Sequence, residues 1–209
     1  METTAYLSKQ AEAGDADAQF RLGYRYAFSR NLAFRDPQSA VFWWRKAAAQ
    51  DHHRAVYNLG DCYFFGDGVR KNAKKAREFY RRAIDLDHAS APYSLGRMYL
   101  DGDGGPVDAK EALKWFRLAE EWEDPEGARM VGYCLFHGIG HREDHALAIP
   151  HYRKAAKWED RYAQFNLGLC YLDGTGVVPS RRWAKHWLEQ ASLQGHRKAR
   201  AILKRESGG

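Results

Sequence analysis

Three histidines, His137, His141 and His145, recur at intervals of four residues, a spacing that would align three imidazoles on one face of a helix. Converging imidazoles of this kind bind zinc, which takes three or four ligands at one point. Gly138-Ile-Gly140 lies between the first two histidines, however, and glycines so placed end a helix rather than continue it. We therefore predict that the three side chains do not converge and that the chain has no metal site.

Two glycine-rich stretches resemble ligand-binding loops without completing one. Asp101-Gly-Asp-Gly-Gly105 has the oxygen ligands of a calcium loop but lacks the distal glutamate. The stretch from Gly66 to Lys71 lacks the Gly-Lys-Ser/Thr end of a phosphate loop. We predict that both stretches are turns and that the chain binds no cofactor.

Cys62, Cys134 and Cys170 are the candidate nucleophiles, since no serine lies in a Gly-x-Ser-x-Gly turn. A reactive thiolate needs electropositive, partly exposed surroundings. Each cysteine instead lies two residues after a repeated glycine, beside the apolar face of a predicted helix, where it would act as a small buried hydrophobe. We predict that no residue is catalytic and that the protein is not an enzyme.

The feature that organises these residues is a Leu-Gly or Val-Gly pair that recurs along the chain. The intervals between its glycines are 37, 36, 36 and 36 residues; the glycines are Gly23, Gly60, Gly96, Gly132 and Gly168. A fixed period of this length is typical of stacked helical repeats. It favours a binding surface over a reaction chamber.

The first helix of each repeat, helix A, contains the repeated glycine. A small residue five positions before the glycine and a Leu or Val one position before it complete an apolar face. Glycine inside a helix costs about 1 kcal/mol relative to alanine, so we expect a neighbouring helix to pass too close there for a side chain. Gly-x-Gly follows helix A in four repeats, as a C-terminal cap and turn, whereas the first repeat has Ser29-Arg30-Asn31.

The second helix, helix B, begins on a residue whose side chain can cap the first turn, and continues with a small–bulky–small stripe at offsets of four and three. The predicted caps are Asp36, Asn72, Asp108, Asp144 and Ser180. The bulky positions are Trp44, Tyr80, Phe116, Tyr152 and Leu188. The sequence therefore predicts an all-α fold, an α-solenoid of antiparallel helix pairs with a 36-residue repeat.

We expect a single solenoid over residues 1–209, closed at both ends by lone helices that cover the exposed faces of the stack. The expected capping helices span residues 3–13 and 196–205. The expected repeats span residues 15–50, 51–86, 87–122, 123–158 and 159–194.

The pattern resembles the Sel-one-like repeat (SLR) family, a relative of the tetratricopeptide repeat (TPR). The second repeat matches the family motif through Ala55, Leu59-Gly60, Tyr63, Gly66, Gly68-Val69, Asn72, Ala76, Tyr80 and Ala83. The resemblance implies a right-handed, TPR-like superhelix whose A helices line a concave face, and an adaptor role in binding other proteins. Some members carry a disulfide between cysteines eight residues apart, and that spacing is absent here.

A stripe on helix A, at offsets −6, −2, +1 and +5 from the repeated glycine, varies while the core positions repeat. Such variation indicates freedom from packing, so we predict that a partner protein or peptide binds there. The predicted partner-binding residues supply Arg and Asp for ion pairs, Asn for backbone hydrogen bonds and Tyr for contact area. They are Arg21, Tyr24, Arg54, Asn58, Asp61, Arg97, Tyr133 and Asn166.

Composition leaves other functions open. The chain has 33 Lys and Arg against 27 Asp and Glu, and this net charge of +6 is compatible with nucleic acid or an acidic polymer as the ligand, although the basic residues are spread along the sequence. A second alternative is an immunity or inhibitor protein that blocks one toxin.

The odd number of cysteines and the absence of a leader or an apolar run long enough to span a membrane favour the cytoplasm. The partner's identity and the oligomeric state are open.

Overall fold

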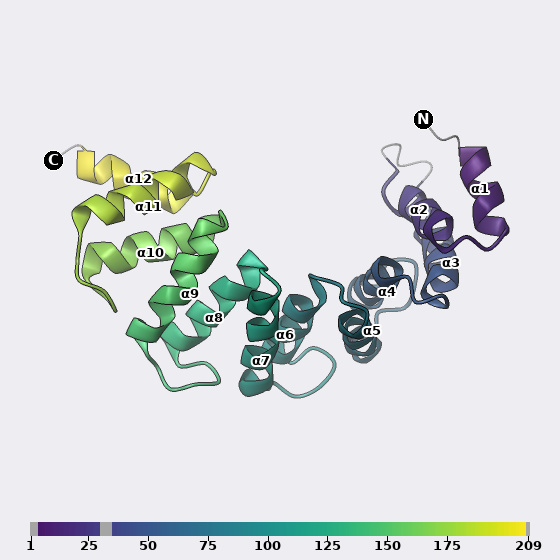
Figure 1. Ribbon diagram of the computed structural model, residues 1–209, viewed down its shortest axis with the longest axis horizontal. Helices are drawn as coiled ribbons and strands as arrows, with labels where there is room; N and C mark the ends of the chain where they lie inside the picture. Colours follow the sequence, from purple (N-terminus) through teal and green to yellow (C-terminus); the bar gives the residue numbers. More distant parts are fainter. Residues whose placement is uncertain (1–3, 30–34, 208–209) are drawn as a thin grey trace. The chain divides into compact units, whose positions relative to one another are not determined.

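The computed structural model describes residues 4–29 and 35–207, and every regular element within these ranges is a helix (Figure 1). This confirms the predicted all-α class. The twelve helices are α1 (Thr4–Glu12), α2 (Ala16–Ala27), α3 (Pro37–Ala48), α4 (His53–Phe65), α5 (Ala73–Asp85), α6 (Ala91–Asp101), α7 (Ala109–Glu121), α8 (Pro125–His137), α9 (His145–Lys157), α10 (Arg161–Asp173), α11 (Arg181–Leu193) and α12 (Arg197–Ser207).

The helices group into two compact units, residues 1–107 and 108–209. In the first unit each helix from α1 to α6 packs against the next, and the same holds from α7 to α12 in the second unit. The even-numbered helices α2 to α10 are the A helices of the five repeats, and the odd-numbered helices α3 to α11 are the B helices. A single solenoid over residues 1–209 stays a prediction.

The predicted capping residues begin all five B helices. The side chain of Asp36 accepts hydrogen bonds from the backbone N–H groups of Gln38 and Ser39, both at 3.0 Å, and its four counterparts make equivalent bonds. Each such cap satisfies donors that the first turn of a helix leaves unpaired.

The two glycines of each Gly-x-Gly turn have different roles. The first, at positions 66, 102, 138 and 174, ends helix A in the left-handed conformation. The second also has positive φ and lies on the first turn of the preceding repeat's B helix: a Cβ at Gly104 would lie 2.7 Å from the carbonyl carbon of Ala73. The turn therefore both ends a helix and joins one repeat to the one before it. The corresponding stretch of the first repeat, including Arg30-Asn31, lies outside the described residues.

The repeated glycine of helix A makes room for the bulky residue of helix B in the same repeat. A Cβ at Gly60 would lie 2.6 Å from Cε1 of Tyr80, and one at Gly132 would lie 2.7 Å from Cδ1 of Tyr152. Trp44 covers Gly23 and Leu188 covers Gly168 in the same manner. The expected close approach is therefore made by a side chain, which fills the space that the missing Cβ leaves.

Close approach of two helices occurs instead at the small position five residues earlier. Gly127 in α8 is one of these small residues, and a Cβ there would lie 2.9 Å from the backbone nitrogen of Glu120 and would also clash with Cβ of Ala119, both in α7. Helix A thus has two contacts: its small residue touches the preceding B helix, and its glycine holds a side chain of the following one.

Each of four A helices is joined to the next even-numbered helix, which is an A helix or the capping helix α12, by a pair of side chains. In three junctions an imidazole stacks on an aromatic ring of the preceding A helix, with centroid distances of 4.6, 4.2 and 4.2 Å. The stacked pairs are Phe20–His52, Tyr57–His88 and Phe165–His196. At a fourth junction Arg129 takes the aromatic position and Asp160 the imidazole position, and their side chains form a 3.1 Å ion pair. The same two positions of the repeat thus form an aromatic stack at three junctions and an ion pair at the fourth.

The contact between Gly60 and Tyr80 predicts the effect of one methyl group. Gly60→Ala should lower the free energy of unfolding by about 2 kcal/mol, because the new Cβ would displace a Tyr80 ring that is only 2% exposed and is held by its hydrogen bond to Asp61. In a Tyr80→Ala background the same change should be neutral or stabilising by up to about 1 kcal/mol, because alanine favours the helix. Urea denaturation of the four variants measures both values, and an equal cost in the two backgrounds would refute the contact.

The stacked imidazoles predict acid sensitivity. Burial lowers the pKa of His88 from its ordinary value of 6.5 to about 4, and the nearby His53 and Arg54 act in the same direction. Protonation therefore favours the unfolded chain, so this stability is present above pH 6.5 and is lost as the pH falls toward 4.

His88→Phe keeps a ring against Tyr57, and it loses no hydrogen bond at Nδ1, which is buried and makes none in the structure. Between about pH 7.5 and pH 5 the variant should lose about 1 kcal/mol less stability than the unmodified chain, allowing for partial exposure of the imidazole. Urea midpoints at the two pH values test this, and identical acid sensitivity would contradict it.

Candidate functional site

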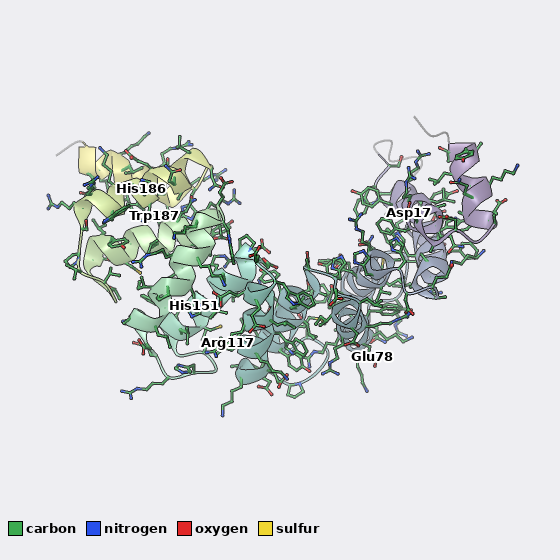
Figure 2. All side chains as sticks on the ribbon, viewed as in Figure 1. Asp17, Glu78, Arg117, His151, His186 and Trp187 are labelled. Atoms are coloured by element: carbon green, nitrogen blue, oxygen red, sulfur yellow. The ribbon has the colours of Figure 1, made fainter. Side chains whose placement is uncertain are left out.

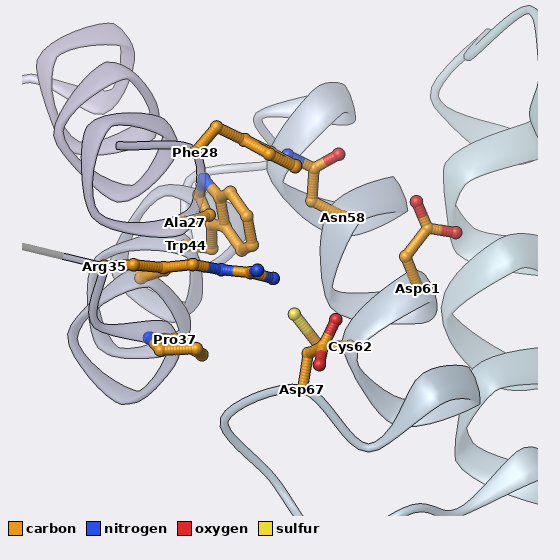
Figure 3. A pocket seen from close by; sticks show the side chains of 10 residues that line it. Ala27, Phe28, Arg35, Pro37, Trp44, Asn58, Asp61, Cys62 and Asp67 are labelled. Atoms are coloured by element: carbon orange, nitrogen blue, oxygen red, sulfur yellow. The ribbon is translucent and has the colours of Figure 1, made fainter. Parts of the chain in front are cut away.

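A notch lies where one A helix meets the next, and it recurs in both units. Figure 3 shows the first notch, between α2–α3 and α4, where the side chains of Trp44, Asn58, Cys62 and Asp67 surround a shared space. We call it notch 1; it is lined by Ala27, Phe28, Arg35, Pro37, Ala40, Trp44, Asn58, Asp61, Cys62 and Asp67.

Notches 2 and 3 repeat this arrangement one and three repeats further along the chain. Notch 2 lies between α4–α5 and α6 and is lined by Tyr57, Asp61, Phe64, Phe65, Tyr80, Tyr93, Ser94, Arg97, Met98, Asp101 and Asp103. Notch 3 lies between α8–α9 and α10 and is lined by Tyr133, Phe136, His137, Tyr152, Asn166, Leu169, Cys170, Asp173 and Thr175.

The three notches use the same positions of the repeat. In each, the bulky residue that covers the helix-A glycine, namely Trp44, Tyr80 or Tyr152, also lines the notch. The next A helix contributes its positions −2, +1 and +2 relative to its own glycine, and the middle residue of its Gly-x-Gly turn. Because the same positions of the repeat line each notch, the notch is a property of the repeat and recurs along the chain.

Five of the eight predicted partner-binding residues line these notches: Asn58, Asp61, Arg97, Tyr133 and Asn166. Arg21, Tyr24 and Arg54 are exposed but line none of the three. Within the predicted stripe, Met130 holds the −2 position of the fourth repeat and is only 6% exposed, so this position can also be used for packing.

Two groups of lining residues were not predicted from the sequence. The bulky helix-B residues were assigned to the core, and Tyr80 is indeed only 2% exposed, but one side of the ring closes the notch. The middle residues of the Gly-x-Gly turns, Asp67, Asp103 and Thr175, were assigned to turns alone. Their fixed distance from the repeated glycine was the signal that could have found them.

Hydrogen bonds hold several notch side chains in place. The hydroxyl of Tyr80 donates to Asp61 at 2.6 Å, so one residue of the notch wall orients another. Burial raises the pKa of the Asp61 carboxyl, and the Tyr80 hydrogen bond opposes that shift. In notch 2 the hydroxyls of Tyr57 and Ser94 are 3.0 Å apart, and Arg97 donates to Asp101 at 3.0 Å.

The notches carry a charge opposite to that of the chain. Carboxylates line all three, and arginines line two of them. The carboxylates are Asp61, Asp67, Asp101, Asp103 and Asp173, and the arginines are Arg35 and Arg97. Within the described part of the chain, the side chains of Asp67, Asp103 and Asp173 have no ion pair or hydrogen bond. The notches therefore have acceptors that are open to a ligand.

The other candidate sites of the sequence are not assembled. His137 ends α8, Gly138 is left-handed and His145 begins α9, so no continuous helix joins the three histidines. No cluster of three potential metal-binding side chains occurs among the residues that the structure describes. The three cysteines are free and buried, and burial raises the pKa of Cys62 and Cys134 to about 12 and that of Cys170 to about 11. Such thiols are poor nucleophiles at neutral pH.

Among residues 4–29 and 35–207, no helix has both the length and the apolar character needed to cross a membrane.

Known structures with a similar fold support the repeat assignment. A protective antigen of uropathogenic Escherichia coli strains that displays an SLR fold superposes with a TM-score of 0.88 at 34% identity, over 94% of this chain and 42% of the antigen chain. A Sel1 repeat protein from Oxalobacter formigenes superposes with a TM-score of 0.81 at 31% identity, over 91% of this chain and 75% of that one. This chain therefore spans about two fifths of the length of the antigen.

A more distant similarity concerns the fold alone. An immunity protein from Pseudomonas aeruginosa superposes with a TM-score of 0.56 at 24% identity, over 88% of this chain and 67% of that one. No curated protein sequence matches the chain.

The family profile described as Sel1 repeat matches five consecutive segments: residues 16–52, 53–88, 89–121, 125–157 and 161–196. The predicted number of repeats and the predicted solenoid fold are thereby confirmed. The matched segments cover most of the chain, which thus belongs to the Sel1 repeat family.

Proposed function

We propose that this protein is a non-enzymatic interaction module that binds a partner protein through the notches between consecutive A helices. The observation that carries the proposal is the recurrence of the same aromatic and polar notch in both units. Side chains of a bound segment can enter successive notches while its backbone lies across the A helices. Sel1 repeats generally serve as protein-interaction modules, which agrees with this assignment.

The proposal includes proteins that bind a single partner tightly. The similarity to an immunity protein extends to the fold and leaves room for such a role, in which a toxin would be the partner. We also propose a cytoplasmic location, because three free, buried thiols suit a reducing compartment.

Site-specific photo-crosslinking tests the binding surface. Benzoylphenylalanine placed at Asn58 or Asn166, which line notches 1 and 3, should crosslink a protein in a lysate of the source cells. The matched controls are Phe42 and Leu147, which lie on B helices and are 51% and 41% exposed. Protein crosslinks from the control positions but not from the notches would contradict the proposed function.

One observation favours a second function, binding to nucleic acid. Helices α11 and α12 hold eight Lys and Arg against two Glu, so their net charge equals the +6 of the whole chain. The basic residues are indeed spread along the sequence, but outside these two helices the numbers of basic and acidic residues are equal in sum. His186 and Trp187 lie on α11 beside this charge (Figure 2), and the neighbouring Trp183 is 47% exposed.

Most of these cations are available to a polyanion. Arg181, Arg182, Arg197, Lys198, Arg200 and Arg205 are exposed and form no ion pair within the described ranges. Exposed tryptophan among unpaired arginines is suited to single-stranded nucleic acid, since bases can stack while phosphates pair with guanidinium groups.

The salt dependence of binding to a 20-nucleotide oligothymidylate tests this second function. Replacing Arg197, Arg200 and Arg205 by Gln should reduce the slope of log K against log salt by about two, because three phosphate contacts are lost. The control replaces Arg70, Lys74 and Lys110, which are exposed outside these helices. Equal slopes for the two triple variants, or no binding at low salt, would exclude α11–α12 as a nucleic-acid site.

A further inference from the structure

We propose that notches 2 and 3 bind the cationic side chains of arginine or lysine residues presented by the partner protein. This inference rests on the proposed function, which it deepens by assigning the chemistry that the partner must offer. Three observations carry it: the guanidinium groups that the chain itself places in notches 1 and 2, the unpaired carboxylates, and the aromatic walls.

Notch 1 shows how a cation fits. Arg35 extends into the notch beneath the ring of Trp44, and its guanidinium points toward the side of the notch formed by Cys62 and Asp67 (Figure 3). The notch therefore has room for a flat cation near an aromatic ring and a carboxylate, and a ligand cation seated closely between them would gain a cation–π contact and charge pairing. The chain's own Arg35 thus occupies the place that we assign to a partner's side chain in the equivalent notches.

Notch 2 retains negative charge after its internal pairing. Arg97 donates to Asp101 at 3.0 Å, which accounts for one of the three carboxylates. Asp61 accepts from the Tyr80 hydroxyl and keeps further lone pairs, and the Asp103 side chain has no partner among the described residues. A second cation would find both carboxylates in the notch that the Tyr57 and Tyr80 rings line, with centroids 5.4 Å apart.

Notch 3 has the carboxylate and the rings but no resident cation. At the position of Asp61 and Arg97 it has Leu169, and neither Lys nor Arg is among its lining residues. Asp173 lines the notch together with Tyr133 and Phe136, and the Phe136 and Tyr152 centroids are 6.1 Å apart. A carboxylate beside several aromatic faces favours a cationic side chain over an anionic or aliphatic one.

The position of the carboxylates explains why they are available. Asp67 and Asp103 are middle residues of Gly-x-Gly turns, and Asp173 is the last residue of α10. The glycine on each side of Asp67 and Asp103 provides the turn's special geometry, so those aspartates are not needed for it. Their side chains are therefore free to select a ligand.

Titration of the full chain with small probes, followed by ¹H–¹⁵N NMR, tests the proposal. N-acetyl-arginine amide or N-acetyl-lysine amide should cause saturable shifts of amides that line notches 2 and 3, and the better probe identifies the preferred side chain. N-acetyl-citrulline amide has the shape of the arginine probe without its charge and should bind at least about tenfold more weakly.

A pair of isosteric variants assigns the effect to the carboxylates. Asp103→Asn with Asp173→Asn should weaken binding of the cationic probe at least about tenfold. The matched control, Asp87→Asn with Glu123→Gln, removes two exposed carboxylates outside the notches and should leave binding unchanged. Equal binding of the citrulline probe, shifts that do not saturate, or an unaffected Asp103/Asp173 variant would overturn the proposal.

The crosslinking experiment separates this inference from the proposed function. A protein that crosslinks at Asn166 in notch 3, and does so equally in the Asp103→Asn/Asp173→Asn variant, overturns only the cationic specificity. Crosslinks confined to the B-helix controls overturn the proposed function itself, whatever the small probes show.

Discussion

The contact between a helix-A glycine and the bulky side chain of the following helix B determines much of this structure. The missing Cβ at Gly23, Gly60, Gly132 and Gly168 leaves a depression that one large side chain fills. Filling it fixes how the two helices of a repeat pack together. The same side chain also closes one side of the notch in the three repeats that supply Trp44, Tyr80 and Tyr152. Core packing and the candidate binding surface therefore depend on one residue, and a change that loosens one alters the other.

Periodic features of the sequence were sufficient to predict the helices, because caps, glycines and apolar stripes act locally. Asn72 caps the N-terminus of α5 and Gly66 caps the C-terminus of α4. Both act within one repeat, and both residue types recur at a fixed spacing in the sequence. What Gly60 contacts was not predictable in this way, because its partner lies 20 residues away and a small residue is compatible with either a backbone or a ring as its neighbour. Only some residues of the notches were predictable from the sequence. Asn58 and Arg97 lie on a variable stripe, whereas Tyr80 recurs at a core position of the repeat although one edge of its ring faces a cavity.

The charge distribution shows why net charge is a poor guide to a binding surface. A chain with a formal charge of +6 has notches in which carboxylates outnumber Lys and Arg, whereas α11 and α12 together carry a net charge of +6. The two surfaces offer opposite charges, so each selects a different class of ligand. Asp61 shows how such a group is maintained in a partly buried place: the Tyr80 hydroxyl supplies the hydrogen bond that water would otherwise provide.

The side-chain pairs that join consecutive repeats limit which repeats can be neighbours. Three junctions stack an imidazole on a ring, and one pairs Arg129 with Asp160. Excision of one period, residues 160–195, would keep the helical pattern intact but would bring the guanidinium of Arg129 opposite His196. The side chains at each junction therefore restrict which units can lie next to each other. Loss or gain of a repeat beside the Arg129–Asp160 junction therefore requires a matching change at the new join, whereas a join between two ring–imidazole junctions does not.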